Sequence, residues 1–168
     1  LLADAIREAR LHAGDVKLAL DVEPPDLVLD GDAERLHQVV ANLVQNAVRH
    51  SPSGGTVAVH ASAVGDAVRI DVDDDGPGVP AADATRVFER FYRADTARSS
   101  DQGGAGLGLA IAQWIVDLHD GDIHVPHALD MEGAIVRLFD PVMHEQVPER
   151  EVSSALMHSE EVDRRWVR

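Results

Sequence analysis

The sequence contains no cysteine, a single lysine and few aromatic residues among its 168 positions. Without cysteine the chain has no disulfide framework, no thiol nucleophile and no thiolate ligand for zinc, which suits a reducing compartment. Basic side chains are scarce, because 15 lysines and arginines stand against 30 acidic residues, and the formal net charge is −15. That charge argues against a protein that binds nucleic acid through its overall field.

Long hydrophobic runs are also absent. The longest nearly unbroken apolar segment, Leu107 to Val116, has about half the length that a membrane-spanning helix needs. The sequence begins with Leu1 and shows no signal-peptide pattern. We therefore expect a cytoplasmic protein without direct membrane insertion, whose recruitment to a membrane would depend on a partner.

Apolar periodicity and turn residues predict a mixture of helices and strands in one domain over residues 1–141. Enough of the chain is hydrophobic, 45%, to form a core. Sparse apolar residues after Pro141 predict a polar C-terminal extension over residues 142–168. The predicted helices are Leu1–Leu11, Asp32–His50, Asp83–Arg90 and Gly106–Leu118, and the predicted strands are Lys17–Val22, Leu27–Leu29, Thr56–Ala63, Ala67–Asp73, Asp122–Val125 and Ala134–Phe139.

The long predicted helix carries two asparagines beside its apolar stripe. Asn42 and Asn46 are four residues apart, so they lie on one flank, which Gln38 and Arg49 extend. Because asparagine lowers helix propensity, this pair indicates either hydrogen bonds to neighbouring loops or a ligand. An amide oxygen can hold an Mg²⁺ ion whose other ligands are water and substrate phosphates, and Asn46 is the candidate.

An acidic, glycine-containing segment, Asp74-Asp75-Gly76-Pro77-Gly78, follows a predicted strand. The two-residue period of a strand puts Asp74 on the same side as the apolar residues that precede it. A carboxylate aimed into apolar space needs a donor, such as the exocyclic amine of adenine, and glycines allow the backbone to approach a ring closely. Taken alone, this segment is also a common acidic turn.

A third signal is the glycine-rich run from Gly103 to Leu109, which leads directly into an apolar helix. Glycines at a helix N-terminus expose backbone N–H groups, and together with the helix dipole these favour phosphate oxygens. The run does not follow a strand in a βαβ unit and contains no G-K-[ST], so the dinucleotide and P-loop interpretations lack their structural context. The hinge of a phosphate-binding lid fits better.

Together with a fourth segment, Val87 to Arg93, these motifs resemble the ATP-binding catalytic domain of bacterial sensor histidine kinases, in the gyrase, Hsp90, histidine kinase and MutL superfamily. His37 to Pro52 resembles the N box, Asp74 to Gly78 the G1 box, Phe88 to Arg93 the F box and Gly103 to Leu109 the G2 box. The resemblance covers about Leu1 to Pro141. It implies an α/β (α+β) two-layer sandwich, with a mixed β-sheet packed on helices, known as the Bergerat fold, and a flexible ATP lid.

The resemblance also implies roles for individual residues. Asn46 would coordinate Mg²⁺, Asp74 would bind adenine, and Gly76 and Gly78 would shape the base pocket. His50 would pack near the nucleotide. The glycines of the G2 box would close the lid over the phosphates, with arginines nearby to bind them. The residues that complete the implied site for ATP and catalysis are Asn42, Arg49, Arg93, Arg98, Gly104, Gly106, Leu107, Gly108 and Leu109.

The resemblance also suggests which reaction is performed. In the ATPase branches of the superfamily, a glutamate one turn before the magnesium asparagine acts as the base for water. That position here is Asn42, which cannot accept a proton at neutral pH. Phosphoryl transfer otherwise depends on positioning and charge stabilisation, so we expect a histidine kinase with slow intrinsic ATP hydrolysis.

A histidine kinase needs an acceptor histidine, and none of the nine histidines here stands in a predicted helical hairpin that precedes the domain. His144-Glu145 is superficially similar to the acceptor motif of the family, but it follows the catalytic region. We therefore expect the acceptor in trans, on a histidine-containing dimerisation protein or domain, with a response regulator as an indirect partner. The chain would be half of a split kinase or a fragment of a longer one.

Three other interpretations remain open at this point. An anti-sigma-type protein serine kinase shares three of the boxes, although the complete Phe88 to Arg93 segment argues against it. A regulatory nucleotide-binding module without transfer activity is the second. A zinc site at His119, His124 and His127 is the third, and the lack of cysteine disfavours it.

Overall fold

The structure is a computed structural model, and it describes residues 1–93, 105–125 and 133–139, the last range in its backbone only. Three α-helices, one short 3₁₀ turn and five strands make up the described chain. In order they are α1 (Leu2–Arg10), β1 (Lys17–Glu23), α2 (Ala33–His50), β2 (Thr56–Val64), β3 (Ala67–Asp74), η1 (Arg86–Phe88), α3 (Gly108–Asp117), β4 (Asp122–His124) and β5 (Gly133–Phe139).

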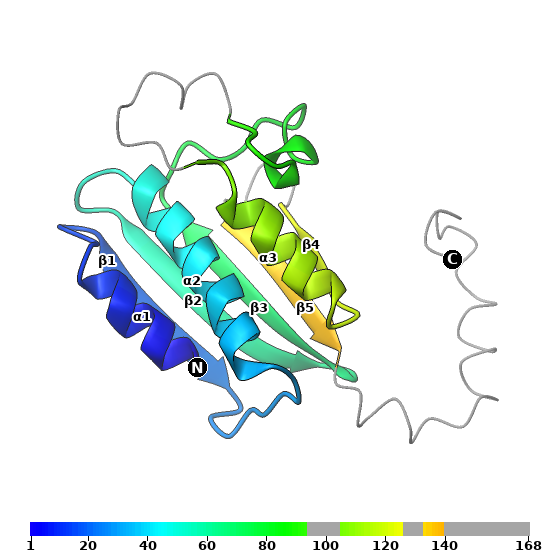
Figure 1. The fold of residues 1–168 in the computed structure, drawn as a ribbon. Helices are drawn as coiled ribbons and strands as arrows, with labels where there is room; N and C mark the ends of the chain where they lie inside the picture. Colours follow the sequence, from blue (N-terminus) through cyan, green and yellow to red (C-terminus); the bar gives the residue numbers. More distant parts are fainter. Residues whose placement is uncertain (94–104, 126–132, 140–168) are drawn as a thin grey trace.

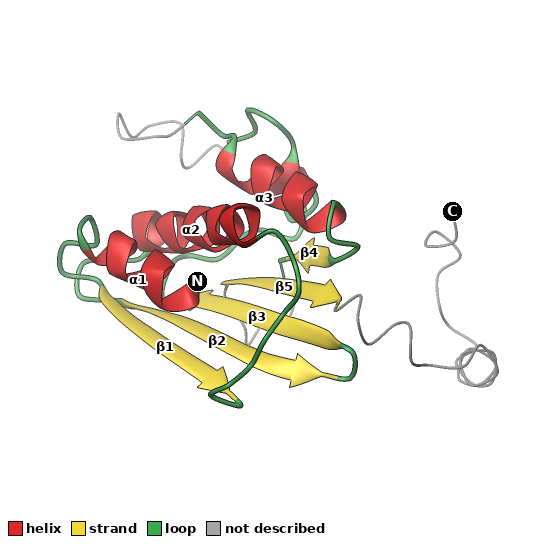
Figure 2. Ribbon diagram, turned by 60° about the horizontal axis from the view of Figure 1, so that its bottom comes forward, coloured by secondary structure: helices red, strands yellow, loops and turns green. Residues whose placement is uncertain are grey.

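The five strands form one mixed sheet in the order β1-β2-β3-β5-β4. Strands β1 and β2 are parallel, because α2 connects them, and the other neighbouring pairs are antiparallel. The three helices lie side by side on one face of the sheet (Figures 1 and 2). In the part of the chain that the structure describes, no helix covers the opposite face. This arrangement confirms the expected two-layer sandwich.

Helix α2 begins and ends where its sequence predicts. The Asp32 carboxylate accepts hydrogen bonds from the backbone N–H groups of Glu34 and Arg35 and so caps the helix, and the Asp32–Arg35 ion pair adds to this end. At the other end, the Ser51 hydroxyl donates to the carbonyl oxygen of Ala47 at 2.9 Å. Both ends are therefore fixed by local side chains, and the position of each residue along the helix follows.

The core lies between α2 and the central strands. Aliphatic side chains on one stripe of α2 pack onto the inward faces of β2 and β3, and α1 and α3 extend this layer on either side. The removal of these side chains from water is the main stabilising contribution, at roughly 25 cal/mol for each Å² of apolar surface. Buried aliphatic residues of this core include Leu36, Val39, Val40, Leu43, Val44, Val57, Val59, Ile70, Val72, Ile115 and Val116.

Two predicted elements are wrong. No strand forms at Leu27–Leu29, because this segment crosses the end of the sandwich from β1 to α2 instead of running along a sheet edge. The alternation there reflects packing, since Leu27 and Leu29 contact the core cluster while Val28 is 78% exposed. The helix expected at Asp83–Arg90 shrinks to the single turn η1, because Glu89 adopts an extended backbone conformation.

Candidate functional site

The middle of α2 and the first turn of α3 meet at Asn42. Its side-chain Nδ2 donates to the carbonyl oxygen of Gly108, the first residue of α3, at 3.1 Å. Gly108 also packs against Asn42, because a Cβ at Gly108 would lie 3.7 Å from the Asn42 side chain, an ordinary van der Waals distance. Asn42 therefore joins the two helices, which accounts for one of the two asparagines on this flank.

Asn46 lies one turn further along α2 and is half-buried. Among the described residues, its side-chain amide makes no hydrogen bond. A partly buried amide without a protein partner loses favourable interactions unless water or a ligand supplies them. This side chain therefore fits the oxygen ligand that a hydrated Mg²⁺ ion requires.

The neighbouring carboxylates of Asp74 and Asp75 point to different partners. Asp74 is half-buried and continues the inward row of β3, beside Val57 in the strand register. Its Oδ1 accepts a hydrogen bond from the backbone N–H of Gly76 at 2.8 Å. Asp75 is exposed, and its Oδ2 accepts from the backbone N–H of Thr56 at 2.8 Å. Only the Asp74 carboxylate lies on the helix side of the sheet.

Gly76 brings the end of β3 against the end of α2. It is buried, and a Cβ at this position would contact Asp74 Oδ1 and lie 3.0 Å from the carbonyl oxygen of His50. No side chain fits between these two backbones, so glycine is required here. Gly78, two residues later, has a φ of 66° in the left-handed region that glycine adopts without strain. Asp74 thereby stands next to the C-terminal turn of α2.

His50 occupies the last position of α2 and is exposed as a residue. The pKa of its imidazole lies below the ordinary value, chiefly because the ring loses hydration and then because Arg49 repels the charged form. The Asp74 carboxylate opposes this shift and raises the pKa. Arg49 and Asp74 are therefore the two charged groups that act on the His50 ring, in opposite directions.

A second backbone contact joins the F box to the G2 box. The N–H of Phe91 donates to the carbonyl oxygen of Gly106 at 2.8 Å, and a Cβ on Gly106 would lie 2.8 Å from the carbonyl oxygen of Tyr92. Gly106 also has a φ of 69°, so both its conformation and its surroundings require glycine. Phe91, before residues 94–104, and Gly106, after them, are therefore in direct backbone contact.

The three aromatic residues of the F box have different environments. Phe88 is buried in the core, whereas the Tyr92 hydroxyl donates to Asp83 Oδ1 at 2.7 Å and its ring lies under the guanidinium of Arg86. Phe91 is 69% exposed and has a φ of 65°, an uncommon conformation for a bulky residue. Two of these rings thus anchor the segment, and the third faces solvent.

The remaining predicted site residues fall into three groups. Leu107 immediately precedes α3 and accepts its first helical hydrogen bond, from the N–H of Ile111, while Leu109 packs against the core. Arg49 is exposed at the end of α2, and Arg93 is half-buried and engaged in an interaction. Arg98 and Gly104 lie outside the described residues, as do the 142–168 extension, His127 and His144.

One contact between the N-terminus of α2 and the C-terminal end of α3 was not predicted from the sequence. The N–H of Asp32 donates to Nε2 of His119 at 3.2 Å, and Nδ1 of His119 lies 2.8 Å from the carbonyl oxygen of Ile115. Donation from Nδ1 leaves Nε2 free to accept, so this geometry suits the neutral ring. His119 is therefore a structural link between α2 and α3, and only the tertiary fold reveals it.

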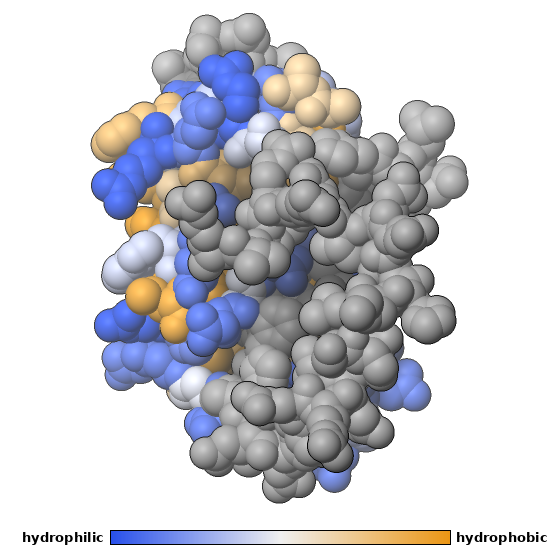
Figure 3. Space-filling view, turned by 90° about the vertical axis from the view of Figure 1, so that its right-hand side faces the viewer, coloured by the Kyte–Doolittle hydropathy of each residue, from blue (hydrophilic) through white to orange (hydrophobic). Residues whose placement is uncertain are grey.

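The surface of α3 that faces away from the sheet carries exposed apolar residues. Trp114 and Leu118 are both about half exposed, and the guanidinium of Arg35 lies 5.7 Å from the Trp114 ring centroid. Figure 3 views the α3 side of the molecule, and on the described surface visible there the hydrophobic residues occur in small groups between hydrophilic ones.

Two further expectations concern metals and membranes. Within residues 1–93 and 105–125, no group of three or more histidine or acidic side chains is arranged to hold a metal ion, and His124 pairs instead with Asp122 at 3.3 Å. None of the described helices is both long and apolar enough to span a bilayer.

Comparison with known proteins identifies relatives of the chain. The family described as histidine kinase-, DNA gyrase B- and HSP90-like ATPase matches residues 31–144. The probable sensor histidine kinase TcrY of Mycobacterium tuberculosis is 44% identical over 138 residues, which cover 82% of this chain and 29% of TcrY. The solved structure of the mycobacterial sensor histidine kinase MprB has a TM-score of 0.72 at 30% identity, over 82% of this chain and 92% of that one.

A further solved structure, full-length ShkA in complex with AMPPNP, has a TM-score of 0.68 at 32% identity. The alignment covers 83% of this chain and 29% of ShkA. The chain likewise spans less than a third of the length of the curated relatives it matches. The family match extends over α2, the end of β3 and the start of α3, which together form the site. The chain therefore belongs to the family of histidine kinase-, DNA gyrase B- and HSP90-like ATPases, and its relatives within that family are sensor histidine kinases.

Proposed function

We propose that the chain binds Mg-ATP and transfers the γ-phosphoryl group to a histidine on a dimerisation domain, which belongs to a partner protein or to another part of a longer kinase. Two observations at the C-terminal end of α2 carry this proposal: the Asn46 amide has no hydrogen-bond partner among the described residues, and the inward Asp74 carboxylate is held there by Gly76. The relationship to sensor histidine kinases supports it, and so does the AMPPNP complex of the relative ShkA.

In this proposal Asp74 selects the base. Its Oδ1 accepts from the Gly76 N–H, and the carboxylate is the proposed acceptor for the exocyclic amine of adenine. The buried glycine holds this carboxylate close to α2, so the adenine would lie between the end of β3 and the helix. A hydrogen bond to a charged acceptor contributes roughly 1.5–3 kcal/mol, which is enough to favour adenine over a base that lacks the amine.

The phosphates require positive charge and backbone donors. Asn46 is the proposed Mg²⁺ ligand, and when bound the ion neutralises charge on the phosphate oxygens. The N–H groups at the start of α3, together with the glycines Gly104, Gly106 and Gly108, would bind the phosphates from the lid side. Arg49, Arg93 and Arg98 are the cations proposed to contact them, in a chain whose net charge is −15.

The same arrangement favours transfer over hydrolysis. The residue one turn before Asn46 is an amide, Asn42, and its N–H already donates to Gly108. An amide cannot remove a proton from water at neutral pH, so the attacking group must be supplied from elsewhere. A histidine nitrogen of the partner would attack the γ-phosphorus, and ADP would leave with the bridging oxygen. A response regulator would receive the phosphoryl group afterwards.

We assign this activity to residues 1–141 and regard 142–168 as an extension outside the catalytic domain. The test is incubation with γ-³²P-labelled ATP and Mg²⁺, alone and with dimerisation domains from related kinases. The expected result is label on the added domain only, removed by acid and retained in alkali, as a phosphohistidine requires. Acid-stable label would indicate a serine kinase. Label on the chain itself would contradict transfer in trans.

Matched variants make this assay specific. Asn46→Ala should abolish labelling, whereas Gln45→Ala, an exposed neighbour on the same helix, should not change it. Labelling that persists at the normal rate in Asn46→Ala would contradict the proposed magnesium ligand.

A further inference from the structure

The segment that leads into the F box forms a compact turn, which is attached to the core and contacts α3. Ala84 and Phe88 are buried in it, and Val87 packs against the core cluster. The backbone N–H of Val87 donates to the carbonyl oxygen of Asp83 at 2.9 Å, which closes the turn. The half-buried Asp83 therefore extends its carboxylate from a backbone that buried neighbours hold in place.

The Asp83 carboxylate binds the side chain of Tyr92. The Tyr92 hydroxyl donates to Asp83 Oδ1 at 2.7 Å, a short hydrogen bond to a carboxylate. The guanidinium of Arg86 lies 4.5 Å from the centroid of the Tyr92 ring, and the backbone N–H of Tyr92 donates to the carbonyl oxygen of Glu89 at 3.2 Å. Residues of this one turn therefore hold Tyr92 at its hydroxyl, its ring and its backbone.

The backbone of Phe91 and Tyr92 contacts Gly106, two residues before α3 begins. The N–H of Phe91 donates to the carbonyl oxygen of Gly106, and no side chain fits between Gly106 and the carbonyl oxygen of Tyr92. Phe91 makes its hydrogen bond with a φ of 65°, which is strained for a bulky residue. Such a conformation persists only where neighbouring contacts hold it, and the contacts of Tyr92 do so.

The start of α3 is consequently held from two sides. From α2, the Asn42 amide donates to the carbonyl oxygen of Gly108. From the turn, the hydrogen bond between Asp83 and Tyr92 acts on Gly106. The backbone N–H groups at the start of α3 are those proposed to bind the phosphates, and a shift of about 1 Å would weaken several of these hydrogen bonds together.

We propose that Asp83 is a positioning residue for the nucleotide phosphates. By accepting the hydrogen bond of the Tyr92 hydroxyl it holds Gly106 in place, and with Gly106 the backbone donors at the start of α3. It acts through Tyr92 and not on the nucleotide itself. This inference rests on the proposed function, and it extends the site to a residue that lies outside all four sequence boxes.

The first measurement uses the full chain without nucleotide. Native-state hydrogen exchange, followed by NMR, reports the opening of the hydrogen bond from the Phe91 N–H to Gly106. Asp83→Leu and Tyr92→Phe each remove the side-chain hydrogen bond and should speed this exchange by about tenfold, while the amides of β2 and β3 exchange as before. Unchanged exchange of the Phe91 N–H in Tyr92→Phe, or equal acceleration in the strands, would overturn the proposal.

The second measurement is isothermal titration calorimetry with Mg-ATP on the same variants. Asp83→Leu and Tyr92→Phe should each weaken binding by about fivefold or more. The double variant should bind no more weakly than the single variants, because both changes remove the same hydrogen bond. Additive losses would mean that Asp83 and Tyr92 act separately, which would contradict action of Asp83 through Tyr92.

Two further variants separate positioning from folding. Asp83→Asn keeps an oxygen that can accept from the Tyr92 hydroxyl, so it should recover most of the affinity lost in Asp83→Leu. Thr85→Ala changes an exposed side chain in the same turn that makes no capping hydrogen bond, and it should bind Mg-ATP as the unaltered chain does. Affinity as low in Asp83→Asn as in Asp83→Leu, or an equal loss in Thr85→Ala, would reject the role of Asp83.

The two measurements also separate this inference from the proposed function. Failure of the unaltered chain to bind Mg-ATP would reject the nucleotide site, and with it the effect of Asp83 on ATP. Exchange of the Phe91 N–H would still decide whether Asp83 holds Gly106, because that measurement needs no nucleotide.

Discussion

At the scale of single residues, Gly76 is the position with the least freedom. It separates the Asp74 carboxylate from the last carbonyl group of α2, and a Cβ would meet both. We predict that Gly76→Ala lowers the free energy of unfolding by about 1–3 kcal/mol, because a backbone or the carboxylate must move. In a chain of this size, each kcal/mol lowers Tm by about 2–4 °C, which calorimetry can measure.

Gly108→Ala is the matched control for this prediction. A Cβ at Gly108 would meet the Asn42 side chain only at ordinary contact distance, and alanine favours the helix that begins there. Its Tm should be unchanged or slightly higher. Equal losses of Tm in the two variants would mean that the close approach at Gly76 does not determine stability.

The lowered pKa of His50 leads to a prediction about pH. Its folded pKa lies below the ordinary value of 6.5, so the unfolded chain takes up a proton first as the pH falls. Stability should therefore decrease as the pH drops through about 6.5 and level off below the folded pKa. Arg49→Gln removes the repulsion and should reduce this decrease. NMR titration of His50 and urea unfolding between pH 5 and 8 test both effects.

Asp74 and Asp75 show what can be read from the sequence at this scale. The period-two rule correctly put Asp74 on the inward side of β3, because Val68, Ile70 and Val72 fix that face. The hydrogen bond from Thr56 to Asp75 could not be predicted, because it depends on the register between two strands. The chemical roles given to these residues by resemblance stay predictions.

At the scale of secondary-structure elements, α2 is joined to α3 near both ends of α3. Asn42 donates to the carbonyl oxygen of Gly108 beside the proposed nucleotide site, and the N–H of Asp32 donates to His119 at the far end. Movement of α3 relative to α2 must break at least one of these contacts. The start of α3, which carries the proposed phosphate-binding N–H groups, is therefore held in place by an asparagine that also stands where an ATPase would have its base.

Because Asn42 both contacts α3 and occupies the position of the ATPase base, the substitution Asn42→Glu is informative. The substitution supplies a carboxylate that can activate water, so we predict faster phosphate release from ATP while Asn46 remains intact. It also removes the side-chain N–H that donates to the carbonyl oxygen of Gly108, which should lower the free energy of unfolding by about 1 kcal/mol. Phosphate release and Tm are measured together. Asn42→Ala, the control, should lose the stability without gaining hydrolysis, and an unchanged hydrolysis rate in Asn42→Glu would contradict the account.

The helices were predictable because each has a one-sided apolar stripe and recognisable ends, as Asp32 and Ser51 show for α2. The error at Leu27–Leu29 has a physical cause. Alternation of inward leucines and outward Val28 occurs in any extended segment laid over a core, and sequence cannot tell whether a neighbouring strand is present to pair with it.

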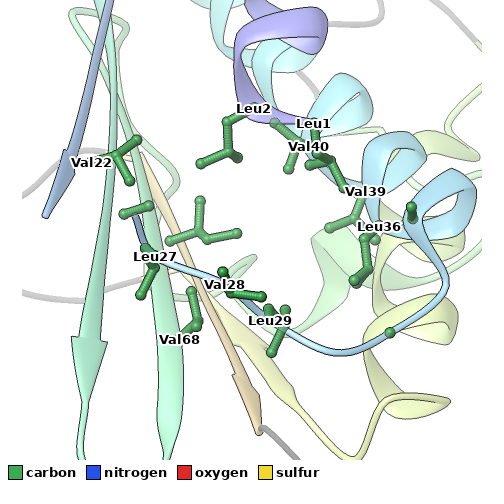
Figure 4. Close-up of a pocket in the computed structure, with 14 residues that line it drawn as sticks. Leu1, Leu2, Val22, Leu27, Val28, Leu29, Leu36, Val39, Val40 and Val68 are labelled. Atoms are coloured by element: carbon green, nitrogen blue, oxygen red, sulfur yellow. The ribbon is translucent and has the colours of Figure 1, made fainter. Parts of the chain in front are cut away.

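At the scale of the whole molecule, the sheet order β1-β2-β3-β5-β4 was the least accessible to residue patterns. The insertion of β5 between β3 and β4 depends on contacts between distant segments, and neither the residue patterns nor the family resemblance as stated specified it. The two ends of α2 have different surroundings. One end carries the proposed nucleotide site, and the other lies beside an apolar cavity of about 310 Å³, whose lining includes Leu36, Val39 and Val40 of this helix (Figure 4).

The central claim is that Asp74 and Asn46 form an ATP site at the first of these ends. The decisive measurement is isothermal titration calorimetry with Mg-ATP on the unaltered chain, Asp74→Asn and Asp75→Asn. We predict that Asp74→Asn weakens binding by at least about tenfold, because it removes a charged hydrogen-bond acceptor. Asp75→Asn, the adjacent carboxylate bound to Thr56, should bind as the unaltered chain does. Equal affinities in the two variants, or no binding by the unaltered chain, would contradict it.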